Sequence, residues 1–146
     1  MRSLLLAAAC LPLALAGCSD QFAPVLPQDA QQLSGISDSA PGVAGCGAMT
    51  FDIRHAVSTI SEVDRIAGRA RMVDPPAGLA SKADSLWVEG YMDKDQMVQI
   101  EVRELRPYIV GPRVYTLWRG YKEGETFVLA EPQPSCGRRV ILASAG

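Results

Sequence analysis

The sequence predicts a mainly β protein, a small antiparallel barrel or sandwich of about six strands that is closed by one disulfide. Three observations indicate this class. Apolar and polar residues alternate with period two along several segments between Met49 and Ser144. The prolines of this region are confined to DPPAG, RPYIVGP and EPQPS, which separate those segments. Cys46 and Cys136 bracket the region almost to its ends.

The first alternating segment is MTFDIRHAV, and period two predicts a strand with one buried face. The residues expected on that face are Met49, Phe51, Ile53, His55 and Val57. Residues 65–72 alternate in the same way, although Thr59 and Glu62 have the spacing of a helix capping box. We therefore expect a strand from about Arg65, while a helix within residues 56–70 stays open.

Two hairpins and a final strand are expected in the rest of the chain. The alternating runs Leu86–Met92 and Met97–Leu105 flank a polar turn, residues 93–96, of hairpin length. In RVYTLWRGYKEGETFVLAE, Gly124 can supply the positive φ that a second tight turn needs. The segment RRVILAS, which follows Cys136, predicts a last short strand.

The first residues of the chain predict where in the cell the protein is located. Arg2 precedes an apolar run of Leu and Ala that ends in small residues, which is the layout of a secretory signal peptide over residues 1–17. The run is shorter than the ~20 residues of a membrane-spanning helix. The stretch Leu15-Ala16-Gly17-Cys18 resembles the lipobox of bacterial lipoproteins. The resemblance implies cleavage before Cys18 and lipid on its thiol, which would hold the protein on a membrane.

The residues after the lipobox refine this expectation. In enterobacterial lipoproteins an aspartate after the lipidated cysteine retains the protein at the inner membrane. Ser19 in this place implies the outer membrane, on its periplasmic side, although Asp20 leaves the inner membrane open. Residues 18–45 are rich in Ser, Gln, Asp, Ala, Pro and Gly, which predicts a flexible lipid-anchored tether ahead of a β domain over residues 46–146.

The cysteine pair is expected to form the disulfide. In an oxidising envelope Cys46 and Cys136 would most simply pair with each other. Closing a loop of ~90 residues stabilises a fold by ~4 to 5 kcal/mol through chain entropy. The spacing is not the CxxC of a reactive thiol pair.

Composition and motifs argue against several functions. A net charge of −2 and a pI near 5.4 give no general attraction to nucleic acid. His55, the single histidine, lies on an expected buried face, and a zinc site would need further ligands. A copper site of His55, Met92 and Met97 is conceivable, but strand methionines are usually core residues. No GxSxG turn is present. We therefore expect no enzyme, cofactor or metal.

A mixture of aromatic residues and arginine predicts a binding face. Trp87 and Tyr91 share the side of their segment opposite Leu86, and Tyr115 and Arg119 alternate with other residues further on. Rigid rings and guanidinium groups are enriched in interaction surfaces. The predicted binding residues are Trp87, Tyr91, Tyr115 and Arg119. They predict a non-catalytic binding or assembly module for an envelope protein or glycan.

The run RVYTLWRGYKEGETFVLAEPQPSC resembles the tail of the membrane-bound inhibitors of c-type lysozyme. The resemblance lies in the order of Tyr115, Trp118, a turn with glycine, alternating apolar residues and Cys136. It implies a small lipoprotein barrel with a terminal disulfide, and makes inhibition of an extracellular enzyme an alternative function. Residues 109–112, Ile-Val-Gly-Pro, replace the family's serine, so we assign no inhibitory residue. A hydrolase with dispersed catalytic residues is the second alternative.

Overall fold

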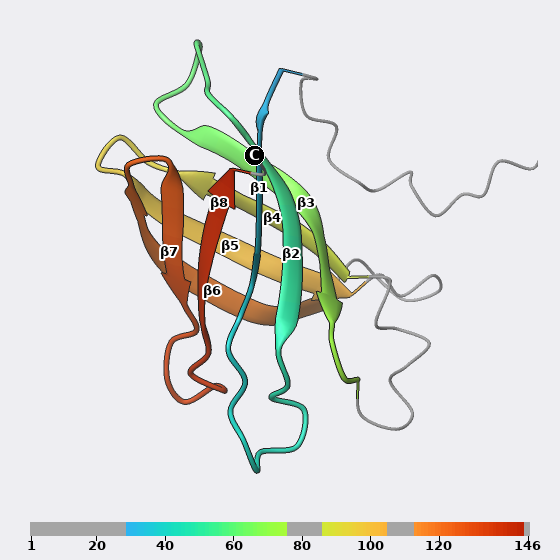
Figure 1. Ribbon diagram of the computed structural model, residues 1–146. Coiled ribbons are helices and arrows are strands. Elements are labelled where there is room, and N and C mark those ends of the chain that lie inside the picture. The colour runs from blue at the N-terminus through green and yellow to red at the C-terminus, as the bar shows by residue number, and fades with distance from the viewer. Residues whose placement is uncertain (1–28, 76–85, 105–112, 145–146) are drawn as a thin grey trace, which may run out of the picture.

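Eight strands form one closed antiparallel barrel in the computed structural model, which describes residues 29–75, 86–104 and 113–144 (Figure 1). Each strand pairs with the next in the chain, and β8 pairs with β1. The strands are β1 Gln31–Ile36, β2 Met49–Ala56, β3 Asp64–Met72, β4 Leu86–Met92, β5 Met97–Glu104, β6 Arg113–Glu123, β7 Thr126–Ala130 and β8 Arg139–Ser144. The prediction of an antiparallel β barrel is confirmed, and the barrel, not the sandwich, is the architecture.

The expected count of about six strands is wrong, and β1 is the strand that sequence patterning missed. It lies within residues 18–45, so the barrel begins before residue 46 and any tether is shorter than expected. Its inward positions are Gln31, Leu33 and Gly35, of which only Leu33 is fully buried. A Cβ at Gly35 would lie 2.3 Å from the backbone oxygen of Ile141, so this position needs glycine and shows no apolar signal. Backbone pairing with β2 and β8 holds the strand.

The two segments after β1 follow the predicted alternation closely. Met49, Phe51, Ile53 and His55 are buried along β2, as expected. Val57 is an exception: it lies beyond the end of β2 and is exposed. Residues 64–72 form a strand, β3, and not a helix. The turn expected at residues 93–96 and the positive φ at Gly124 are also present.

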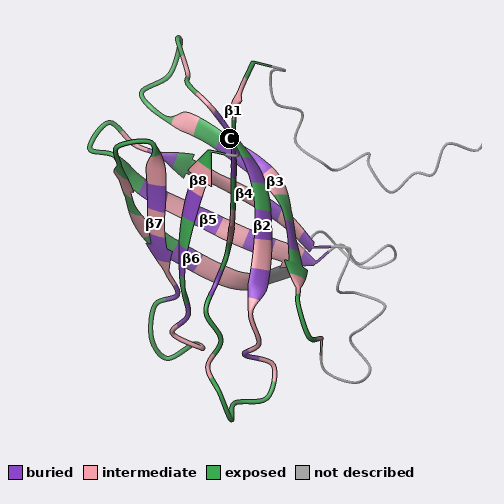
Figure 2. Cartoon of the chain, in the orientation of Figure 1, coloured by how far each residue is buried: buried purple, intermediate pink, exposed green. Residues whose placement is uncertain are grey.

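Buried residues alternate with less buried ones along most of the strands (Figure 2), and their side chains make one apolar core. Trp118 on β6 is completely buried and packs edge-on against Phe51 at 5.2 Å between ring centroids. The other core residues are Leu33, Met49, Ile53, Ile66, Ala70, Leu86, Val88, Met92, Val98, Ile100, Val102, Phe127, Leu129, Val140 and Leu142. The described part of the chain has no helix that is both long and apolar enough to cross a membrane.

The barrel has two different ends. The disulfide end carries the β1–β2 loop, residues 37–48, and the β7–β8 loop, residues 131–138. The predicted disulfide between Cys46 and Cys136 is confirmed and joins these two loops, with 5.4 Å between the Cα atoms. The amino-terminal end carries the start of β1 and the β2–β3 loop, residues 57–63 (Figure 1).

Candidate binding face

Two of the predicted binding residues, Tyr91 and Arg119, lie in one row on the outside of the barrel. Tyr91 on β4 is opposite Gln99 on β5, and Gln99 is opposite Arg119 on β6. The Nε of Arg119 donates a hydrogen bond of 3.0 Å to Oε1 of Gln99. Because neighbouring strands are about 4.8 Å apart, the backbones at Tyr91 and Arg119 are about 10 Å apart across the sheet.

Two further residues, which were not among the predicted binding residues, lie beside this row. Met97 on β5 is directly opposite Tyr121 on β6, and both point outward beside the row of Gln99. The exposed fractions are 43% for Tyr91, 51% for Met97 and 47% for Tyr121. Period two from Arg119 would have placed Tyr121 on the same side. We call Tyr91, Met97, Gln99, Arg119 and Tyr121 the β4–β6 face.

Trp87 is on the same outer side of β4, but its side chain is only partly exposed. The guanidinium of Arg69 on β3 lies over the indole ring, 5.1 Å from its centroid. The indole Nε1 is buried and has no hydrogen-bond partner among the described residues. The residue opposite Trp87 on β5 is Arg103, which forms ion pairs of 3.1 Å with Glu89 and 2.5 Å with Glu101. These charged contacts lie on the same outer surface, next to the β4–β6 face.

Tyr115 does not join this face, because β6 contains a β-bulge. Val102 pairs with Thr116, but the next residue, Arg103, pairs with Val114, so Tyr115 is left as the extra residue. A bulge of this kind redirects a side chain. Tyr115 packs against the apolar core beside the disulfide end, so the predicted binding role is not supported by its position.

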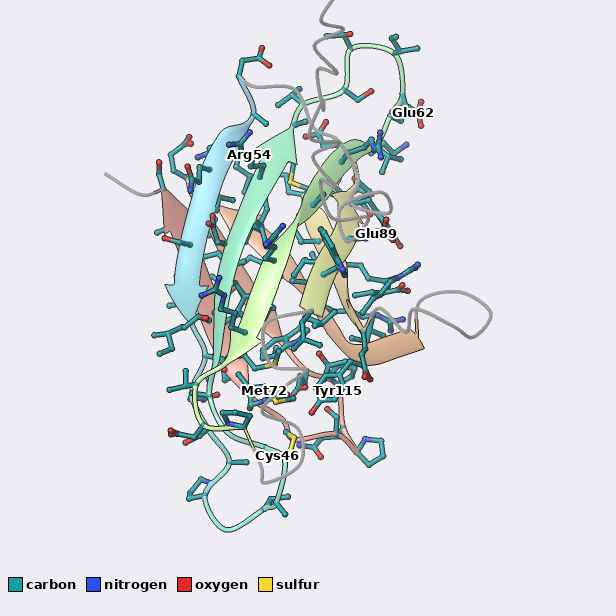
Figure 3. All side chains as sticks on the ribbon, turned by 90° about the vertical axis from the view of Figure 1, so that its right-hand side faces the viewer. Cys46, Arg54, Glu62, Met72, Glu89 and Tyr115 are labelled. Carbon is teal, nitrogen blue, oxygen red and sulfur yellow. A yellow bond between two sulfur atoms is a disulfide. The ribbon has the colours of Figure 1, made fainter. Side chains whose placement is uncertain are left out.

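The surroundings of Tyr115 are charged as well as apolar. In Figure 3 it lies next to Met72, above Cys46. Burial raises the pKa of its phenol above the ordinary value. The charge of Arg138 lowers this pKa, while the carboxylates of Glu131 and Glu104 raise it.

Arg138 and Glu131 form a buried ion pair at the disulfide end. The Nε and Nη2 atoms of Arg138 donate hydrogen bonds of 2.9 and 2.7 Å to the two carboxylate oxygens of Glu131. Nη1 donates a bond of 2.6 Å to the backbone oxygen of Gly47, in the loop that carries Cys46. The guanidinium also lies over the Trp118 ring, 5.4 Å from its centroid. Every part of the guanidinium therefore has a structural contact within the fold.

His55 is a core residue at the amino-terminal end of the barrel. Its Nε2 is 2.8 Å from Oδ2 of Asp64, and its ring packs edge-on against Phe127 at 5.3 Å between centroids. The Nδ1 atom is buried and has no hydrogen-bond partner within the described chain. Met97 points outward while Met92 and His55 are buried inside the wall, so the conceivable copper site is not assembled.

Within residues 29–75, 86–104 and 113–144, no three side chains of His, Cys, Asp or Glu are grouped to hold a metal ion. Cys18, the predicted lipidation site, lies outside the described residues, as do residues 109–112. No family model, curated protein or solved structure matches the chain. The function must therefore be argued from its own residues.

Proposed function

We propose that this chain is a lipid-anchored protein of the bacterial cell envelope whose barrel is a non-catalytic binding or assembly module. The observation that carries the proposal is the β4–β6 face, where two tyrosines, a methionine and an arginine are exposed side by side on three paired strands. Tyrosine, methionine and arginine are enriched in interaction surfaces, and strands hold such groups more rigidly than loops do.

The chemistry of the β4–β6 face suits a protein or a glycan partner. Two phenol hydroxyls and the amide of Gln99 can donate and accept hydrogen bonds, and the guanidinium of Arg119 donates only. The aromatic rings add apolar contact area at low cost in conformational entropy, and the flexible Met97 side chain adds apolar area that can adapt to a partner. A partner with carbonyl or carboxylate oxygens next to apolar groups, such as a peptide or an acidic sugar, fits this combination.

A non-catalytic role is supported by the surroundings of the single histidine. A histidine that acts as a general base must reach a proton on a nucleophile or a water. In His55 one ring nitrogen is bonded to Asp64, and the other is buried in the barrel wall without a polar partner among the described residues. The His55–Asp64 pair is therefore better suited to fixing β2 to β3 than to catalysis.

The anchor at Cys18 and the outer membrane remain part of the proposal. Asp29, the first described residue, is eleven positions after Cys18. A fully extended chain of this length spans about 40 Å at most. Lipid on Cys18 would keep the barrel this close to the membrane and raise its effective concentration near partners there. The periplasmic side of the outer membrane is the proposed location.

The aromatic residues that carry the resemblance to lysozyme inhibitors do not form an exposed surface that could bind an enzyme. Trp118 is completely buried, and Tyr115 packs against the core. The Trp118 side chain is therefore inaccessible to an enzyme, and the Tyr115 side chain is only partly exposed. This alternative, like a hydrolase with dispersed residues, is therefore kept as an outcome of the test below.

Photocrosslinking in intact cells tests the binding role. A photoreactive residue at position 91 or 119 is expected to capture one defined envelope protein or glycan, while the same residue at Ser34, exposed on β1, is not. Changing Tyr121 to alanine should reduce that capture by about tenfold, because a central interface residue contributes ~1.4 kcal/mol or more. Capture of added lysozyme with loss of its activity would favour the inhibitor. Capture from Ser34 but from neither position 91 nor 119 would remove the β4–β6 face.

A further inference from the structure

The β2–β3 loop holds the two most exposed large apolar side chains in the described part of the chain. Ile60 at the middle of residues 57–63 is 98% exposed, and Val57 is 73% exposed. Val63, at the end of the loop, is exposed as well. Single exposed apolar residues are common on protein surfaces. Three of them within a seven-residue loop are typical of a site that contacts another molecule or a membrane.

The loop is held in this conformation by its own serine side chains. Ser58 Oγ accepts a hydrogen bond of 2.8 Å from the backbone nitrogen of Ser61. Ser61 Oγ donates a bond of 2.7 Å to the backbone oxygen of Val63. The backbone nitrogen of Ser58 donates a bond of 2.9 Å to Oδ1 of Asp64, whose other oxygen binds His55. The polar groups thus bond inside the loop, and Ile60 is left pointing away from the barrel.

The position of the loop suggests what covers it. The loop and the start of β1 are at the same end of the barrel, as Figure 1 shows. The chain reaches β1 from Cys18, which is only eleven positions before Asp29. A membrane that held lipid on Cys18 would therefore be approached first by the amino-terminal end of the barrel, while the disulfide end would lie away from it.

We propose that the tip of the β2–β3 loop inserts Ile60 and Val57 into the interfacial region of the phospholipid bilayer that holds the anchor. The proposal deepens the proposed function and rests on its lipid anchor. Burial of two aliphatic side chains among the upper acyl groups supplements a lipid anchor in the same way as a second, weaker membrane signal. The loop then sets the orientation of the barrel, with the β4–β6 face directed sideways toward partners on the same membrane.

The charges around the loop indicate which bilayer surface fits. Glu62 is exposed at the loop, and Arg54 on β2 is exposed below it (Figure 3). Arg65 near the start of β3 is exposed as well. Charges of both signs give no strong attraction to anionic headgroups, unlike a cluster of several basic residues. We therefore expect insertion to depend on the apolar tip, on largely zwitterionic lipid, and to change little with salt.

In-cell photocrosslinking with two labels tests this orientation. The full chain carries a photoreactive residue at position 60 or, as the control, at Val43, which is 56% exposed in the β1–β2 loop at the opposite end. Radioactive phosphate labels phospholipid but not the thioether-linked diacylglyceryl group, and labelled palmitate reports the anchor. After illumination, position 60 should acquire at least about five times more phosphate label than position 43 on equally palmitate-labelled protein. Ile60 has almost no contacts to lose, so either form should fold.

The two labels separate the two proposals. Equal phosphate label at positions 60 and 43, on palmitate-labelled protein, would overturn the inserted loop and leave the anchor in place. Phosphate label at position 60 without palmitate would overturn the anchor but keep the loop as a membrane contact. Absence of both labels would overturn both.

Discussion

Replacing Arg138 with leucine is expected to lower the free energy of unfolding by about 3 to 5 kcal/mol, because the change leaves the Glu131 carboxylate buried without its partner. It also removes the hydrogen bond to the backbone of Gly47 and the contact with the Trp118 ring. Urea denaturation followed by tryptophan fluorescence would measure the loss. Arg139→Leu is the matched control. The side chain of Arg139, the next residue in the chain, is exposed, so its replacement should change the free energy of unfolding by less than about 0.5 kcal/mol.

A double variant shows whether the loss comes from the buried pair. If Glu131→Gln is combined with Arg138→Leu, the total loss should be clearly smaller than the sum of the two single losses, because the second change removes a charge that the first left unpaired. Additive losses would contradict the role of the ion pair. Equal effects of Arg138→Leu and Arg139→Leu would contradict it more simply.

The second large effect is expected from the disulfide. Changing both Cys46 and Cys136 to alanine should lower the free energy of unfolding by about 4 to 5 kcal/mol, because the closed loop spans 90 positions of the chain. The melting temperature should fall by roughly 15 °C or more. The bond joins two loops at one end of the barrel, so its loss should loosen that end first.

Reduction of the wild-type protein provides the matching experiment. The reduced protein should lose about as much stability as the double alanine variant, and the double variant itself should not respond to reductant. When native envelope is alkylated before the protein is unfolded, both cysteines should stay unmodified, because their sulfur atoms are joined in the disulfide. Recovery of free thiols at Cys46 and Cys136 would show that the bond is absent in the cell, whatever its effect in purified protein.

Much of the fold could be predicted because apolar and polar residues alternate with period two along most of the strands. In β2 and β5 the inward positions are nearly all large and apolar, so the alternation marks both the strand and its buried face. β1 could not be found in this way. Its inward positions hold a glutamine, a leucine and a glycine. The strand is held by backbone pairing on both sides, which does not depend on the residue types and so gives no sequence pattern.

The sequence predicted the side of the barrel wall for some of the proposed binding residues, but not for all of them. Tyr91 and Arg119 lie on the outer side of the barrel, because the alternation is regular along β4 and along β6 from Thr116 onward. Tyr115 was misplaced because a β-bulge adds a residue to β6 and shifts the alternation by one. The buried pair of Glu131 and Arg138 was missed because charged residues beside a proline-rich turn are normally solvated, and only the closed barrel brings them inside.

Metabolic labelling with palmitate tests the anchor at Cys18, on which both the envelope location and the loop orientation depend. Wild-type chain grown with labelled palmitate is expected to carry label and to sediment with outer-membrane fractions. The Cys18→Ala variant should lose the label and the membrane association, and should still fold, because Cys18 lies before the first strand of the barrel. Equal labelling of the two chains, or no label in either, would contradict the lipid-anchored protein proposed here.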